Sequence, residues 1–119
     1  MIKLKRAYDL PEEEDGVRIL VDRFWPRGMR RDAARIDRWE KDLAPSLMLC
    51  KWFSHDPARW PEFRRRFREE LAEHAEAIRR LAQESRENVV TLVYSARDEA
   101  HNQALVLRQV LEEAAAPPP

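Results

Sequence analysis

Residues Val89–Tyr94 read Val-Val-Thr-Leu-Val-Tyr, a short run that is apolar on both faces of an extended chain. Such a run is typical of a central strand that is buried between two layers, as in a parallel sheet covered by helices. It is far shorter than the roughly 20 residues of a membrane-spanning helix. The polar residues Arg86-Glu87-Asn88 precede it. This segment therefore predicts an α/β fold rather than a helical bundle.

Amphipathic helices are predicted on both sides of this strand. Asp56-Pro57 provides an N-cap and a first-turn proline, and an apolar stripe then runs for some 26 residues to Ala82. The stripe consists of Trp60, Phe63, Phe67, Leu71, Ala75, Ile78 and Ala82. After the strand, Ser95 and Asp98 have the spacing of a capping box, so the last helix is expected to begin at Ser95 and to end near Glu113.

The first half of the chain predicts further strands. Ile2–Tyr8 alternates apolar and basic residues, and Val17–Val21 is a short β-branched run. The acidic turn between them is short enough for a hairpin or a tight crossover, which leaves the direction of the first strand open. Ile36–Leu43 fits either a helical face or a short edge strand, and Leu47–Phe53 fits a short helix.

We therefore expect one α/β domain over residues 1–113, a small layered structure of three to four mostly parallel strands with helices packed on the sheet. A chain of 119 residues is the size of a single domain. The segment 114–119 ends in three prolines, which cannot continue a helix, and is expected to be a disordered tail.

Composition excludes several classes of protein. The 22 Lys and Arg residues balance 22 Asp and Glu residues, so the total charge indicates no polyanionic partner. The single cysteine, Cys50, excludes an internal disulfide or a thiolate zinc site, and no histidine pair has metal-ligand spacing. We therefore expect a cytoplasmic protein with no metal site, no export signal and no membrane contact.

Two loops follow the predicted strands at the edge where open α/β sheets bind ligands. One is Asp22–Arg27 and the other is Ser95–Asn102. The guanidinium groups of arginines can bind an anion through two hydrogen bonds, and the free backbone amides at the start of a helix at Ser95–Asp98 would also favour an anion. The predicted ligand is a phosphate-bearing metabolite or nucleotide, and the predicted ligand-binding residues are Arg23, Arg27, Ser95, Arg97 and Asn102.

Acid–base chemistry in this pocket would depend on side chains that titrate or orient a titrating group. The catalytic candidates are Asp22, His55, His101 and Asp98. For Asp22 an ion pair with Arg23 or Arg27 is the plainer alternative, and Ser95 is expected to act only as a cap. The sequence does not tell the cofactor, the use of a metal or the oligomeric state, and it leaves open whether the domain is an enzyme or only binds its ligand.

A second function class is a nucleic-acid-binding or regulatory module. Val17–Arg38 holds seven arginines against three aspartates, and Arg59–Arg68 holds five against Glu62, a net charge of +4 in each. The candidate surfaces are Arg30–Arg38 and Arg59–Arg68. Pairing of these arginines with glutamates on the same helix is the competing interpretation. A third class, a protein-interaction domain, would need an exposed apolar patch around Leu47–Phe53.

Four motifs in order resemble the YeaO-like branch of the domain-of-unknown-function 488 family. They are Val-Asp-Arg-Phe-Trp-Pro-Arg-Gly at 21–28, Leu-Ala-Pro-Ser at 43–46, Lys-Trp-Phe-Ser-His-Asp-Pro at 51–57 and Tyr-Ser-Ala-Arg-Asp-Glu-Ala-His-Asn at 94–102. The sequence departs from the family's pattern at Phe24, where leucine is expected. It departs again at Ser95, where alanine is common, which argues against a catalytic Ser95. The resemblance implies a small cytoplasmic α/β protein of bacterial type and assigns no activity.

Overall fold

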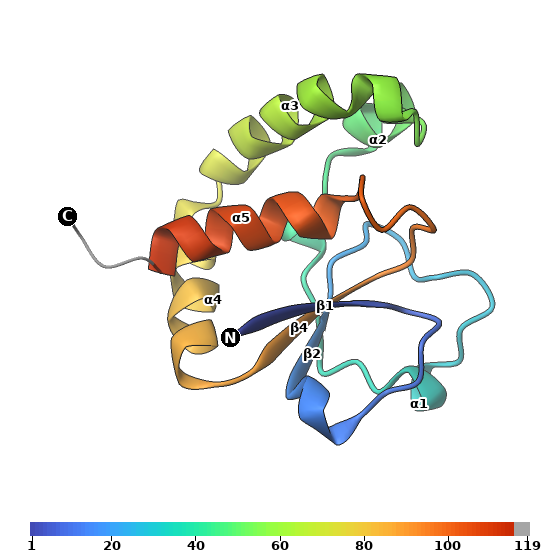
Figure 1. Ribbon diagram of the computed structural model, residues 1–119, viewed down its shortest axis with the longest axis vertical. Helices are drawn as coiled ribbons and strands as arrows, with labels where there is room; N and C mark the ends of the chain where they lie inside the picture. The colour runs from blue at the N-terminus through green and yellow to red at the C-terminus, as the bar shows by residue number, and fades with distance from the viewer. Residues whose placement is uncertain (116–119) are drawn as a thin grey trace.

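A four-stranded, entirely parallel sheet forms the centre of the molecule, and the computed structural model describes residues 1–115 (Figure 1). The strands are β1 (Ile2–Arg6), β2 (Val17–Leu20), β3 (Arg38–Trp39) and β4 (Val90–Tyr94), in the spatial order β1-β4-β2-β3. β4 pairs with β1 from Ile2–Val90 to Arg6–Tyr94 and with β2 from Val17–Val90 to Leu20–Val93. The α/β fold class and the central position of the apolar strand are confirmed.

The direction of β1, open in the sequence, is decided by β4 lying between β1 and β2. Residues 7–16 carry the chain from the end of β1 back to the start of β2, on the far side of β4. The short 3-10 helix η1 (Glu13–Asp15) and Gly16, at φ 63°, make the last bend. A Cβ at Gly16 would overlap the carbonyl oxygen of Val89, which accepts a hydrogen bond from the amide of Val17 at 3.0 Å. Glycine is therefore required where β2 starts beside β4.

Four helices pack on one face of the sheet: α2 (Leu47–Phe53), α3 (Trp60–Ala72), α4 (Ala75–Glu87) and α5 (Gln103–Ala115) (Figure 1). Their apolar stripes cover Ile19, Val21, Val90, Leu92 and Tyr94 of the sheet. Short 3-10 helices, η2 (Lys41–Leu43) and η3 (Pro57–Arg59), lead into α2 and α3. Among residues 1–115, none of the helices has the length and apolar character needed to cross a bilayer.

The opposite face of the sheet is covered mainly by loops, whereas the sequence predicted helices on both sides. Leu20 and Val93 pack there with Ala7 and against the partly buried Trp25 and Trp39. The only α-helix on this side within the described residues is the four-residue α1 (Arg31–Ala34). A buried ion pair, Arg18 to Asp15 at 2.6 Å, lies at the same face. Thus the far face holds a thinner, more polar layer than predicted.

The single long helix predicted from Pro57 to Ala82 is wrong, because the chain breaks at Glu73 and His74. The amide of His74 donates to the carbonyl of Leu71 at 2.9 Å, and α4 then starts with its own first bond, from Ile78 to His74. The break carries no glycine or proline. It lets the stripe of α3 contact α2 and α5 while the stripe of α4 packs on α5 and the sheet.

In the ambiguous segment 36–43 the edge-strand alternative is confirmed by β3, which the 3-10 helix η2 follows. The end of the chain differs from the prediction. The last helix runs from Gln103 to Ala115, so it starts seven residues later than a cap at Ser95 predicts. Of the tail expected at 114–119, residues 114 and 115 belong to α5, and residues 116–119 lie outside the described part of the chain.

Candidate functional site

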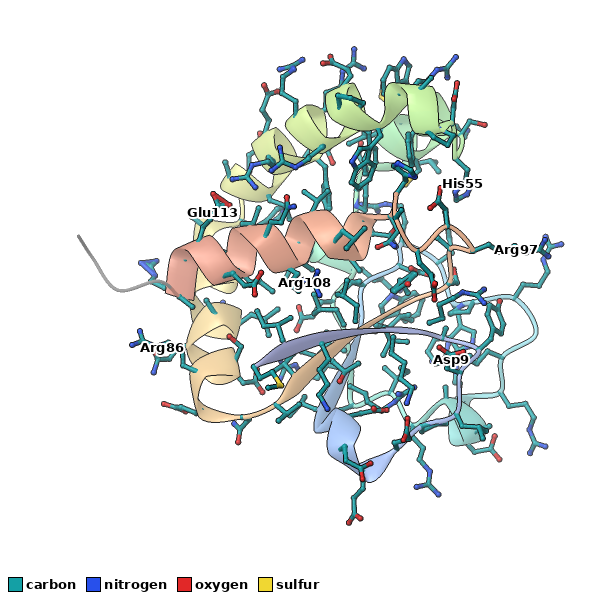
Figure 2. All side chains as sticks on the ribbon, in the orientation of Figure 1. Asp9, His55, Arg86, Arg97, Arg108 and Glu113 are labelled. Carbon is teal, nitrogen blue, oxygen red and sulfur yellow. The ribbon has the colours of Figure 1, made fainter. Side chains whose placement is uncertain are left out.

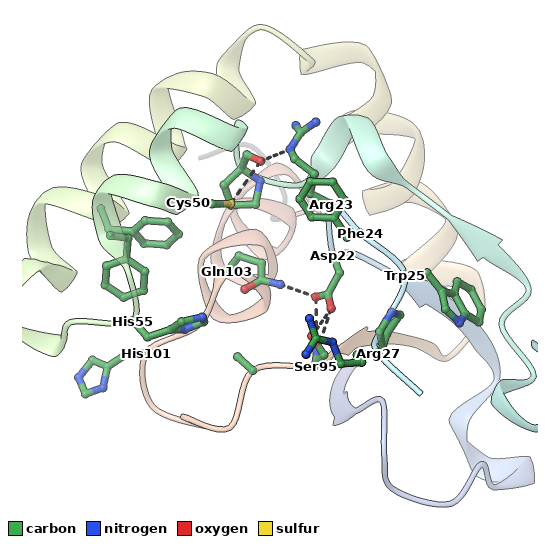
Figure 3. Close-up of a pocket in the computed structure, with 15 residues that line it drawn as sticks. Asp22, Arg23, Phe24, Trp25, Arg27, Cys50, His55, Ser95, His101 and Gln103 are labelled. Carbon is green, nitrogen blue, oxygen red and sulfur yellow. Dashed lines mark hydrogen bonds between the residues drawn. The ribbon is translucent and has the colours of Figure 1, made fainter. Parts of the chain in front are cut away.

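A cavity of about 250 Å³ lies at the carboxyl ends of β2 and β4 (Figure 3). Because these strands are parallel neighbours, the loops that follow them, 22–27 and 95–102, leave the same edge of the sheet. Asp22, Arg23, Arg27, His55, Ser95 and His101, all predicted as site residues, line this one cavity. The remaining lining residues are Phe24, Trp25, Pro26, Pro45, Cys50, Phe53, Phe63, Ala96 and Gln103.

The carboxylate of Asp22 lies at the centre of the site and is 7% exposed. It accepts hydrogen bonds from the amide of Ser95 at 3.2 Å, from the Ser95 hydroxyl, and from Nε2 of Gln103 at 2.6 Å. Burial raises the pKa of Asp22 above its usual 3.8, against the hydrogen bonds from Ser95 and Gln103, which lower it. The ion pair with Arg23 or Arg27 that the sequence suggested does not form among the described residues.

Arg23 and Arg27 both come from the loop after β2, but they are held differently. Nε of Arg23 donates to the carbonyl of Pro45 at 2.6 Å, which fixes a half-buried side chain against the segment before α2. The Arg27 side chain is exposed, while its backbone carbonyl accepts a 2.9 Å hydrogen bond from the hydroxyl of Tyr8. Neither guanidinium is within ion-pair distance of a carboxylate in residues 1–115.

Helix α2 supplies the opposite wall of the cavity. Its N-cap, Ser46, accepts from the amide of Leu49 and is itself held by Glu70 of α3, which receives the Ser46 amide at 2.8 Å and hydroxyl at 2.6 Å. This attachment presents Phe53, whose ring stacks on Phe63 with centroids 4.3 Å apart. The wall is therefore aromatic and is fixed by a charged tether to α3.

The two candidate histidines lie at the rim. His55 follows Ser54, and both residues have left-handed backbone angles, φ 55° and 47°, which turn the chain from α2 into η3. Nδ1 of His101 lies 2.9 Å from Oδ2 of Asp98, and its ring meets Trp60 edge to face at 5.4 Å. The hydrogen bond from His101, together with one from the Ala100 amide, lowers the pKa of Asp98. Asp98 thus orients His101 without lining the cavity.

The predicted helix start at Ser95 is wrong, and with it the predicted use of helix amides there. The Ser95 hydroxyl donates to Asp22 instead of capping, and Asp98 accepts the amides of Ala100 and His101 in a turn. Asn102 acts as the cap of α5, since its Oδ1 accepts the amide of Leu105 at 3.1 Å. His101 therefore lies before the helix and not one turn into it.

Two of the predicted ligand-binding residues do not line the cavity. Asn102 is buried beneath the loop, where Nδ2 donates to the carbonyl of Asp98 at 3.0 Å. The side chain of Arg97 is exposed and points away from the molecule on the outside of the loop (Figure 2). The loop continues to residue 102 before α5 begins, and Arg97 lies on the outer side of this loop. Its side chain therefore does not reach the edge of the sheet.

Sequence reasoning missed Gln103 and assigned Cys50 and Phe53 only to packing. Gln103 was missed because the last helix was expected to begin at Ser95, which would place Gln103 inside that helix. It directly follows the fourth family-like motif. Burial raises the pKa of the Cys50 thiol, opposed by the nearby charge of Arg23. The cavity therefore holds a protonated thiol and not an activated nucleophile. Within residues 1–115, no set of three His, Cys, Asp or Glu side chains is arranged to hold a metal ion.

On the candidate surfaces Arg30–Arg38 and Arg59–Arg68, six of the nine arginines pair with neighbouring carboxylates. On α3, Arg65 and Arg66 both contact Glu62, at 2.7 and 2.8 Å, and lower its pKa to about 2. Further pairs join Arg30 to Asp32, Arg38 to Glu84, Arg59 to Asp56 and Arg68 to Glu113. Near α2, Leu47 and Met48 are exposed while Phe53 is buried.

Comparison with known proteins identifies the family. Residues 1–117 match the family described as the inactive DUF488-N3 subclade. The chain is 42% identical over 106 residues to "Uncharacterized protein YeaO" of Escherichia coli (strain K12), which covers 89% of this chain and 92% of that protein. It is also 42% identical over 110 residues to "Uncharacterized protein Rv3073c" of Mycobacterium tuberculosis (strain ATCC 25618 / H37Rv), with 92% of each chain covered. No solved structure matches the chain significantly. The match over nearly the whole chain and the likeness to YeaO show that this protein belongs to the DUF488 family, in its YeaO-like branch.

Proposed function

We propose that the cavity binds a small phosphate-bearing metabolite of nucleotide type, and that the chain is a binding domain for it rather than an enzyme. The observation that carries the proposal is that Arg23 and Arg27 both line the cavity and that neither is paired with a described carboxylate. Arg31, Arg35 and Arg64 also have no carboxylate partner among residues 1–115, but they do not line the cavity. Unpaired guanidinium groups in a concave site are suited to a phosphate. A ligand of this kind is met in the cytoplasm, the location expected from the sequence.

The size and lining of the cavity favour a single heterocyclic base with its anionic group. A volume of about 250 Å³ is close to the lower end of the about 300–1,000 Å³ range of small-molecule sites. Phe24, Trp25, Phe53 and Phe63 give it apolar, planar walls against which a heterocycle can stack. Both features suit a mononucleotide better than a polymer.

Binding without turnover is supported by the state of the side chains that chemistry would need. Burial raises the pKa of the Cys50 thiol, which disfavours the thiolate that would act as a nucleophile. The matching family is described as inactive. Catalytic roles for Asp22, His55, His101 and Asp98 stay predictions, for which a reaction on the bound ligand would be the test.

The proposal is tested by calorimetric titration with a nucleoside, its 5′-monophosphate and inorganic phosphate. We expect the monophosphate to bind at least tenfold more tightly than the nucleoside, since charge-assisted bonds to phosphate are about 1.5–3 kcal/mol each. Arg23→Gln and Arg27→Gln should remove most of that difference. Arg30→Gln, an exposed arginine three residues beyond Arg27, is the matched control and should bind like the unaltered protein. Equal binding of nucleoside and monophosphate would refute the proposal.

The nucleic-acid alternative is less well supported, because the surfaces at Arg30–Arg38 and Arg59–Arg68 carry internal ion pairs. Releasing those arginines to phosphate would mean breaking the pairs first. Titration of duplex and single-stranded DNA and RNA at two salt concentrations tests this alternative. Tight binding that weakens steeply with salt would favour it over the small-ligand proposal.

A further inference from the structure

Asp22 differs from the other buried aspartate of this protein in having no cationic partner. Asp15, which is 5% exposed, contacts both Arg18 at 2.6 Å and Lys5 at 3.2 Å. Asp22 is as buried as Asp15, yet among residues 1–115 only neutral donors reach it, those of Ser95 and Gln103. A buried carboxylate is normally paired with a cation, and Asp22 lines a cavity instead.

Asp22 and Gln103 form the polar floor of the cavity, and this floor offers hydrogen-bond acceptors. An ionised carboxylate has about four lone-pair sites and no donor, and three donors reach Asp22. Gln103 turns its amide nitrogen toward Asp22, so its Oε1 must face the other way. Figure 3 shows that oxygen on the side away from Asp22, toward the cavity. Two other donors of the cavity lining are already used, since Arg23 Nε and the Cys50 thiol both point to the carbonyl of Pro45.

We propose that Asp22 and Gln103 together select a nitrogen heterocycle whose edge donates two adjacent hydrogen bonds, as the N1–H and amino group of guanine do. This inference rests on the proposed function, which places the phosphate of the same ligand at Arg23 and Arg27. Adenine presents an acceptor nitrogen beside its amino group, and that lone pair would face the Asp22 carboxylate. Hypoxanthine offers only one of the two donors.

The position of the phosphate is consistent with this orientation. An anionic group beside the Asp22 carboxylate would be repelled, so the donor-bearing edge of the ring must lie at the floor. The phosphate then points outward along the loop that carries Arg23 and Arg27, and Arg27 is at its exposed end. The aromatic side chains between floor and rim are left for the faces of the ring.

The test measures dissociation constants for guanosine, inosine and adenosine and for their 5′-monophosphates with the full chain. We expect guanosine monophosphate to bind at least tenfold more tightly than adenosine monophosphate, with inosine monophosphate between them. The Asp22→Asn variant, whose amide places a donor at the floor, should bind guanosine monophosphate about tenfold more weakly and lose the preference over adenine. Circular dichroism of this variant shows whether it is folded, and the ranking of the three bases on the unaltered protein does not depend on it.

The outcomes separate the two proposals. Monophosphates that bind equally well whatever the base, and more tightly than nucleosides, overturn the guanine preference and leave the phosphate site standing. A preference for guanine, with each nucleoside bound as tightly as its own monophosphate, supports the role of Asp22 and refutes the phosphate site. Failure of all six compounds to bind at millimolar concentration overturns both.

Discussion

Nε2 of Gln103, the first residue of α5, donates a 2.6 Å hydrogen bond to Oδ1 of Asp22, which follows β2 81 positions earlier. The same carboxylate receives the amide and hydroxyl of Ser95, after β4. Three segments of the chain thus meet on one buried charge. Because that charge has no cationic partner in residues 1–115, its protonation is linked to folding.

The Asp22→Asn variant should show how the stability of the fold depends on pH at this position. Burial raises the folded pKa of Asp22, so its contribution to stability is complete below the usual value of 3.8 and is lost as pH rises through the folded value. Relative to Asp22→Asn, the unaltered protein should therefore lose free energy of unfolding as pH rises from 4 to 7. Urea denaturation of both proteins across this range measures the difference.

Asp98→Asn is the matched control with the opposite sign. The hydrogen bond from His101 lowers the pKa of Asp98, so its contribution is present above the unfolded value and is lost as pH falls through the folded one. The unaltered protein should gain stability relative to Asp98→Asn as pH rises through the folded pKa of Asp98 toward 3.8. Slopes of the same sign for both variants would contradict this account of the site.

Glu70→Ala should destabilise the protein by about 2 kcal/mol, because Glu70 is the charged acceptor for both the amide and the hydroxyl of Ser46. The loss also frees the start of α2, so protection of α2 amides from hydrogen exchange should fall before that of the sheet. Glu69→Ala, which removes only the contact to the exposed Arg65, should change stability by about 0.5 kcal/mol or less. Equal effects of the two would show that the tether is not structural.

Ser54→Gly should stabilise the protein by about 0.5–1 kcal/mol. Ser54 ends α2 at φ 47°, a left-handed conformation that glycine adopts without the Cβ penalty, and the Ser54 amide donates to the carbonyl of Cys50 at 3.0 Å. Thermal unfolding monitored by circular dichroism measures the shift. Ser54→Ala removes the hydroxyl but keeps the Cβ, so a gain in that variant would assign the effect to the hydroxyl instead.

Gly16→Ala should be much more damaging than Gly28→Ala. Both glycines have positive φ, 63° and 77°, but only at Gly16 would a Cβ meet the carbonyl of Val89. We expect a loss of about 3 kcal/mol at Gly16, from backbone strain and overlap, against about 1–2 kcal/mol at Gly28 from strain alone. Chemical denaturation of the two variants compares them directly. Equal losses would indicate that the contact with β4 relaxes freely.

The identity of most elements was predictable from the sequence, because it depends on local pattern. The double-sided apolarity of Val90–Tyr94 predicted the central strand, and the stripe from Trp60 predicted helix. The meeting of loops 22–27 and 95–102 at one edge also followed, since parallel neighbours end together. Arg23 and Arg27, which lie on the first of these loops, both line the cavity, and their role as ligand-binding residues stays a prediction.

The errors arose where a distant partner replaced a local one. Ser95 and Asp98 have the spacing of a capping box, but the Ser95 hydroxyl donates to Asp22, 73 positions away, and the helix starts later. The break at Glu73–His74 has no glycine or proline to announce it. It depends on α3 and α4 packing against different surfaces.

The sequence by itself determined the fold class, the family and the loops that line the cavity, since each depends on the pattern of neighbouring residues or on the order of motifs along the chain. Only the tertiary structure decided the order of the strands, the outward position of Arg97 and the isolation of the Asp22 charge among neutral donors. Those features depend on which groups meet across long stretches of chain, and burial gives such contacts their energetic weight.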